Sequence, residues 1–122
     1  MSSILIAEDD VGIRELLRFK LQDMYDVTIV TNGEECWSYL ETNADDLPNL
    51  IVLDVMMPGL DGYRILDRMR DDDRFDDIDV IMLSSRGKED DITRALESGA
   101  TDYMTKPFSL NELVARLKKA LQ

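Results

Sequence analysis

The chain has 122 residues, 44% hydrophobic and 33% charged, which fits one globular domain over residues 1–122 with a real core. Its formal net charge of -12 argues against nucleic acid or an anionic membrane as a direct partner, because both select basic surfaces. A single Cys36 and the lack of histidine exclude internal disulfides, Cys/His zinc sites and histidine-based triads, which leaves carboxylates, lysine and hydroxyls for chemistry.

The first apolar run, residues 4–7, predicts a strand and ends at the acids Glu8-Asp9-Asp10. No basic leader precedes it, and no apolar run approaches the roughly 20 residues that span a bilayer, so a cytoplasmic location is expected. From Val11 to Met24, apolar residues recur at the spacing of an amphipathic helix. Its expected inner positions are Ile13, Leu16, Leu17, Leu21 and Met24.

A second strand is predicted at residues 27–30 and is broken by Asn32-Gly33. A helix ending near Asn43 should follow. Its buried side is marked by Cys36, Trp37 and Leu40, and Trp37 is expected to pack rather than to carry function.

Residues 50–54 form an unbroken apolar run ending in Asp54, with Pro58 and Gly59 just beyond it. Such a run predicts a strand buried on both faces, as in a parallel sheet. Ligands of open α/β sheets bind outside the carboxyl ends of the strands, so Asp54 is a candidate for chemistry. A helix N-cap or a turn residue is the structural alternative.

Asp61 is expected to cap a third helix. The inward residues of this helix are Ile65, Leu66 and Met69. The acidic run 71–77 is interpreted as a solvated loop and not as a calcium site, because it lacks the glycine and terminal glutamate of an EF-hand loop. A buried strand at residues 80–83 then ends at Ser84-Ser85.

A fourth helix is predicted with Gly99 at its C-terminal cap. One face of it carries Ile92, Ala95 and Leu96. A fifth strand at 101–104 leads to the loop 106–108, and Ser109 with Glu112 predicts a capping box for the last helix. The apolar stripe of that helix is Leu110, Leu113, Val114, Leu117 and Leu121.

Five strands alternating with five helices imply parallel strands, right-handed crossovers and a three-layer α/β sandwich. All strands then end at one edge of the sheet. The residues expected at that edge are Glu8, Asp9, Asp10, Asp54, Ser84 and Lys106. Carboxylates about 4 Å apart repel by about 4 kcal/mol at an effective dielectric near 20, so the cluster needs protons or a cation.

Oxygen ligands suit Mg²⁺, which is typically held by one or two carboxylates and by phosphate oxygens. A carboxylate beside such a metal and a lysine can attack phosphorus, while Lys106 and Ser84 spread the charge of the transferred group.

Three segments together resemble one known family. They are Ile4-Leu5-Ile6-Ala7-Glu8-Asp9-Asp10, residues 53–62 (LDVMMPGLDG) and residues 99–108 (GATDYMTKPF). The chain is similar, nearly end to end, to the response regulator receiver domains of two-component systems, including chemotaxis regulators. The resemblance implies a flavodoxin-like (βα)5 fold with a parallel five-stranded sheet in the order 2-1-3-4-5.

The resemblance also implies roles for individual residues. Asp54 would be the phosphoacceptor, and Glu8, Asp9, Asp54 and the Met56 carbonyl would hold Mg²⁺, with Asp10 opening the first helix instead. Lys106 would contact a phosphoryl oxygen through a loop with a cis Lys106-Pro107 peptide. Ser84 and Tyr103 would form the switch, although a half-exposed strand tyrosine is the alternative for Tyr103.

By the same resemblance the protein is a regulatory phosphoacceptor and not an enzyme in its own right. Its partners would be a sensor histidine kinase or a phosphotransfer protein and an unidentified output target. Asp102 and Arg116 match a pair used in phosphorylation-dependent homodimers, but Ile92 stands where such members often carry a basic residue, so a homodimer is left open. The chain is either a stand-alone regulator or a receiver from a longer protein.

Three other functions fit the sequence less well. An aspartyl-phosphate phosphatase would need an acid where Met56 stands, two residues after Asp54. A flavin or nucleotide binder would need a Gly- or Thr-rich loop where Glu8-Asp9-Asp10 would repel phosphate. A pure interaction module has no reason to combine the acids with Ser84 and Lys106.

Overall fold

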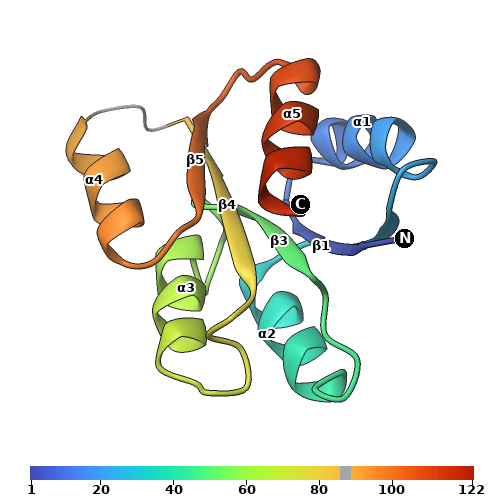
Figure 1. Cartoon of the computed structure of the whole chain (residues 1–122). Helices are drawn as coiled ribbons and strands as arrows, with labels where there is room; N and C mark the ends of the chain where they lie inside the picture. Colours follow the sequence, from blue (N-terminus) through green and yellow to red (C-terminus); the bar gives the residue numbers. More distant parts are fainter. Residues whose placement is uncertain (86–88) are drawn as a thin grey trace.

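A computed structural model, which describes residues 1–85 and 89–122, shows five parallel strands alternating with five helices in those residues (Figure 1). The strands are β1 (Ser3–Ala7), β2 (Asp26–Val30), β3 (Leu50–Asp54), β4 (Asp79–Ser84) and β5 (Asp102–Thr105). The helices are α1 (Val11–Leu21), α2 (Gly33–Thr42), α3 (Gly62–Arg70), α4 (Glu89–Glu97) and α5 (Leu110–Ala120). The strand order β2-β1-β3-β4-β5 confirms the predicted flavodoxin-like sheet.

Helices cover both faces of the sheet, α1 and α5 on one side and α2, α3 and α4 on the other (Figure 1). Each side has its own apolar core, and β3 contributes alternate residues to both. Every residue of β3 is therefore buried, as its unbroken apolar run predicts. In the described part of the chain, no helix combines the length and apolar character needed to cross a bilayer.

Local sequence signals set the helix starts. Four side chains accept a hydrogen bond from the backbone N–H three residues on, namely Asp10, Asn32, Asp61 and Ser109. The predicted caps Asp61 and Ser109 are confirmed. Glu112, the other half of the predicted capping box, instead accepts a hydrogen bond from Arg116 Nη2 at 2.8 Å.

In α1 and α4 the buried stripe of apolar residues is narrower than the sequence pattern predicts. α1 ends at Leu21, before Met24, and Leu16 is 47% exposed. Leu96 in α4 is also 47% exposed. In each helix a neighbouring residue, Leu17 or Ala95, points at the sheet, and one step along a helix rotates a side chain by about 100°.

Most of the acidic segment 71–77 is exposed, as predicted for a solvated loop, but Phe75 anchors it to the core. Phe75 is fully buried against the Trp37 ring, with centroids 5.3 Å apart in an edge-to-face arrangement. This contact confirms the expected packing role of Trp37, and it holds the α3–β4 connection against α2.

Arg70, the last residue of α3, joins two connections at the edge of the sheet where β4 and β5 begin. Its Nε and Nη2 donate to the Gly99 carbonyl at 3.0 and 2.8 Å. Its Nη1 donates to the Asp76 carbonyl at 2.9 Å. One guanidinium thus fixes the α3–β4 and α4–β5 loops to each other.

Candidate functional site

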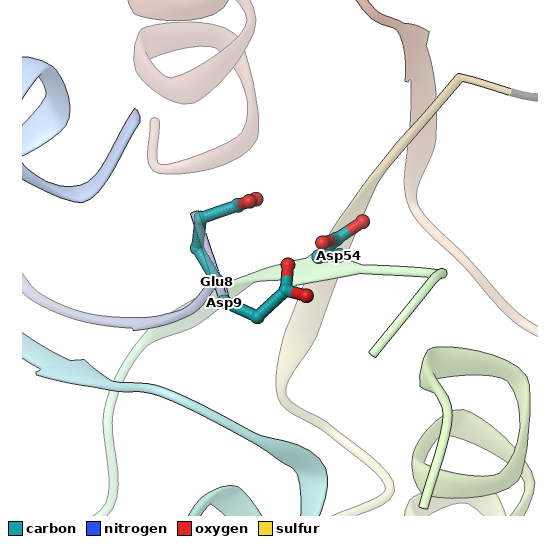
Figure 2. Close-up of side chains that lie close together, drawn as sticks. All are labelled: Glu8, Asp9 and Asp54. Carbon is teal, nitrogen blue, oxygen red and sulfur yellow. The ribbon is translucent and has the colours of Figure 1, made fainter. Parts of the chain in front are cut away.

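Three carboxylates meet where β1 and β3 end. Asp54 is the last residue of β3, and Glu8 and Asp9 directly follow β1, which pairs with β3 in parallel register. One oxygen from each of the three lies within 4.8 Å of the others (Figure 2). Glu8 and Asp54 are buried and Asp9 is exposed, so the cluster opens to solvent on the Asp9 side.

Asp10 lies outside this cluster, because its carboxylate caps α1 by accepting from the Ile13 N–H at 3.0 Å. Asp10 thus opens the first helix, as expected, while the role of Asp9 as a metal ligand stays a prediction.

Lys106 brings a positive charge to the acids from the end of β5. Its Nζ donates to both carboxylate oxygens of Glu8 at 3.0 Å and lies 3.3 Å from Asp54 Oδ2. The Lys106 N–H donates to the Ser84 carbonyl at 2.7 Å, which ties this loop to the end of β4. The Lys106-Pro107 peptide is cis, as predicted.

The two expected switch residues lie on neighbouring strands. Ser84 is the fully buried last residue of β4, opposite Thr105 of β5. Tyr103 is also buried, so it is not the half-exposed tyrosine of the structural alternative. Its side chain is hydrogen-bonded to Tyr63 at the start of α3.

Burial and neighbouring charge make Asp54 a weak acid in the metal-free site. Burial, the charge of Glu8 and a hydrogen bond with Asp9 raise its pKa to about 7, against the opposing effects of Lys106 and the Met56 N–H. Burial lowers the pKa of Lys106, but the hydrogen bond to Glu8 and the charges of Asp54 and Glu8 outweigh it and leave that pKa above its ordinary value.

These acids are held in place partly through their backbone. Arg14 Nη1 donates to the Glu8 carbonyl at 3.2 Å and the Asp9 carbonyl at 2.9 Å. The Met56 N–H donates to Asp54 Oδ1 at 3.2 Å, while the Met56 side chain faces solvent. The oxygen donors of the cluster suit Mg²⁺, which prefers a few carboxylates and keeps positions for water and phosphate.

A hollow of about 410 Å³ adjoins the site between the β3–α3 loop and α4. Tyr63 and Arg94 line one side of it, with the guanidinium carbon 4.0 Å from the ring centroid. The Tyr63 hydroxyl donates to the Asp91 carbonyl at 3.1 Å, and burial together with Tyr103 raises the pKa of Tyr63 to about 12. Tyr63 thus links α3, α4 and β5.

Sequence reasoning missed three residues around the site, Arg14, Glu34 and Tyr63. The helical pattern places Arg14 only on the polar face of its helix, and no motif indicates a role for Glu34 or Tyr63. Glu34 Oε1 accepts from the Leu60 N–H at 3.0 Å, across 26 residues of sequence. All three bind backbone groups or side chains of other segments, and no local pattern signals such contacts.

Comparison with protein-family models matches residues 4–118 to the response regulator receiver domain. Among curated proteins, the chain is 40% identical over 121 residues to the phosphate regulon transcriptional regulatory protein PhoB of Pseudomonas aeruginosa, covering 98% of this chain and 52% of that protein. The chain spans about half the length of the curated relatives it matches.

Solved structures give the same result. The receiver domain of the Francisella response regulator 1452 is similar with a TM-score of 0.89 and 32% identity, over 98% of this chain and 96% of that one. The Mn²⁺-bound form of response regulator Rcp1 has a TM-score of 0.83 and 25% identity, over 98% and 91%.

Proposed function

This chain belongs to the response regulator receiver domains of two-component systems, and from that premise we propose that it is a phosphorylation-dependent switch whose acceptor is Asp54. The observation that carries the proposal is the position of the Asp54 carboxylate. It lies at the carboxyl edge of the sheet, 3.3 Å from the Lys106 amine and within 4.8 Å of oxygens of Glu8 and Asp9.

Mg²⁺ is the cation this site would take. Glu8, Asp9 and Asp54 would hold it, with the Met56 carbonyl as a further oxygen ligand. Bound there, the ion would neutralise charge on the acids and on the phosphoryl oxygens of the donor. The Mn²⁺-bound Rcp1 relative supports a divalent ion in this fold.

Asp54, Lys106 and Ser84 would each have a different role in phosphoryl transfer. An Asp54 oxygen forms the new bond to phosphorus as the bond from phosphorus to the donor's leaving group breaks. Lys106 compensates charge on the phosphoryl oxygens, and the Ser84 hydroxyl is the neutral donor that can follow the group. Because Asp54 titrates near pH 7 in the metal-free site, a cation that relieves the repulsion keeps it ionised and nucleophilic.

The signal would leave the site through Ser84 and Tyr103. A phosphoryl group brings roughly -1.5 to -2 charges and new acceptor oxygens, which draw the Ser84 hydroxyl inward. Tyr103 is on the neighbouring strand and hydrogen-bonded to Tyr63, so its movement changes the surface between α4 and β5.

The proposal includes partners and location. A sensor histidine kinase or phosphotransfer protein would supply the phosphoryl group in the cytoplasm, and an unidentified output target would receive the signal. For a homodimer through the α4–β5–α5 face, Arg116 Nη1 is already paired with Asp102 at 2.6 Å within the chain. A dimer that exchanged this pair would first have to break it, which argues for a monomer before phosphorylation.

Intact-mass analysis with acetyl phosphate and Mg²⁺ tests the proposal. One phosphoryl adduct is expected in the wild type and in Asp10→Asn, which removes a neighbouring acid but keeps an equally good helix cap. Asp54→Asn should show none. An adduct that persists in Asp54→Asn refutes the acceptor assignment, and a wild type without any adduct favours a pure interaction module.

The metal-dependent phosphatase has no support from the comparisons, because the matching family is a regulatory domain.

A further inference from the structure

The loop between β3 and α3, residues 55–61, carries Met56 and is held by hydrogen bonds at both ends. The Val55 N–H donates to the Leu83 carbonyl at 2.9 Å, and the Gly62 N–H closes the loop by donating to the Val55 carbonyl at 3.0 Å. The middle of the loop is held from outside. There the N–H of buried Leu60 donates to Glu34 Oε1 of α2 at 3.0 Å.

Two glycines make this contact close. Gly59 has φ +76°, and a β-carbon added to it would collide with the Glu34 carboxylate. A β-carbon on Gly33, one residue before Glu34, would overlap the Leu60 carbonyl. The fit between the first turn of α2 and the segment 59–60 therefore requires glycine at position 33, where the Leu60 backbone leaves no room, and favours it at position 59 because of the positive φ.

We propose that Glu34 is a positioning residue for the metal-binding loop. By holding the Leu60 N–H, it keeps residues 55–61, and with them Met56, in the conformation that adjoins Glu8, Asp9 and Asp54. The role rests on the proposed Mg²⁺ function. It adds a residue from α2, an element that supplies none of the acids, Ser84 or Lys106.

Glu35 provides a matched control in the same helical turn. It carries the same charge near the same helix N-terminus, but it accepts from the Thr31 N–H at 2.8 Å and from the Thr31 hydroxyl rather than from the loop. Any effect of charge alone, on the helix dipole or on the field at the site, should appear in both Glu34→Ala and Glu35→Ala. An effect of holding the loop should appear only in Glu34→Ala.

Mg²⁺ binding to the full chain is measured by titration of backbone amide chemical shifts. Glu34→Ala should weaken binding about tenfold more than Glu35→Ala, at the low end of the roughly 10–100-fold effect of losing a supporting contact behind a metal ligand. Glu34→Gln keeps an acceptor oxygen without the charge and should restore most of the affinity. Equal weakening in Glu34→Ala and Glu35→Ala, or no recovery in Glu34→Gln, overturns the positioning role.

Two further readouts do not depend on the metal. The Leu60 amide should exchange with solvent about tenfold faster in Glu34→Ala, the equivalent of ~1.4 kcal/mol. In unfolding measurements, Gly59→Ala should destabilise the wild type more than it destabilises Glu34→Ala, because the second background lacks the colliding carboxylate. If Gly59→Ala destabilises both backgrounds equally, or if the Leu60 exchange rate is unchanged in Glu34→Ala, the contact does not hold the loop.

The outcomes separate the two proposals. A wild type that binds no Mg²⁺ overturns the proposed function and the positioning role with it. A wild type that binds Mg²⁺ while Glu34→Ala behaves like Glu35→Ala overturns the positioning role alone.

Discussion

Replacing Asp54 by Asn should stabilise the metal-free protein at high pH. The pKa of Asp54 rises from its ordinary value of 3.8 to about 7, first because the carboxylate is buried and then because Glu8 repels it. The folded state therefore binds a proton that the unfolded chain has already released between these two pH values. Linkage then requires that stability from this group falls as pH rises from about 4 to about 7.

The pKa values fix the size of the effect. A shift of about three units corresponds to about 4 kcal/mol when both states are fully ionised. Between pH 5 and pH 8, the loss of stability from this group amounts to about 2–3 kcal/mol. Because Asn does not titrate, the free energy of unfolding of Asp54→Asn should rise relative to wild type by that amount over this range.

Urea unfolding in EDTA at pH 5, 6, 7 and 8 measures the difference in free energy of unfolding between the two proteins, in which the titration of groups distant from Asp54 largely cancels. Asp10→Asn is the control and should run parallel to wild type. Saturating Mg²⁺ should reduce the stability advantage of Asp54→Asn over wild type, because the ion binds and stabilises only the protein that retains Asp54. A difference between Asp54→Asn and wild type that does not change with pH would refute the reasoning.

Three more results are expected. Beryllofluoride with Mg²⁺ should shift the amide signals around Tyr103 and α4, because a phosphoryl-like group draws in Ser84; unchanged signals there would exclude this route. Phe75→Ala should cost about 3–5 kcal/mol in urea unfolding, whereas Asp73→Asn in the same acidic segment should cost under about 0.5 kcal/mol; similar values would show that the segment is not anchored. In KCl without Mg²⁺ the melting temperature should rise from 0.1 to 1 M salt, as the Debye length falls from about 10 to about 3 Å and the net charge of -12 is screened. A flat or falling trend would remove the repulsion argument.

Most of the fold could be predicted because its signals are local. The apolar runs at 4–7, 50–54 and 80–83 are strands in the structure, and the caps Asp61 and Ser109 are set by residues three positions apart. Alternation of strands and helices gave parallel pairing, but only the family resemblance supplied the strand order. The gathering of Glu8, Asp9, Asp54 and Lys106 followed from the shared edge of a parallel sheet.

The predictions that were wrong or missing depend on contacts between segments that are not local in sequence. A helical apolar pattern shows which side faces the core but not how wide the covered stripe is, so Leu16 and Leu96 were placed inside and are exposed. Phe75 is fully buried, but the aspartates on both sides of it make the segment look entirely polar in sequence. Arg14 and Glu34 act on backbone groups of other segments, and such contacts depend on packing rather than on spacing along the chain.

Arg70 has a consequence for how α4 can move. Its guanidinium clamps the Gly99 carbonyl just beyond the end of α4, at the pole of the molecule opposite the acids. The described part of α4 is otherwise joined to α3 through Tyr63, which contacts Asp91 and Arg94. Tyr63 is hydrogen-bonded to Tyr103, so its contact with the first turn of α4 should change when Tyr103 moves, whereas the Arg70 contact should not. We therefore expect α4 to tilt about Gly99 rather than slide. Residual dipolar couplings of the α4 amides with and without beryllofluoride would reveal the rotation, and an amplitude that grows from Glu97 toward Glu89 would identify Arg70 as the fulcrum.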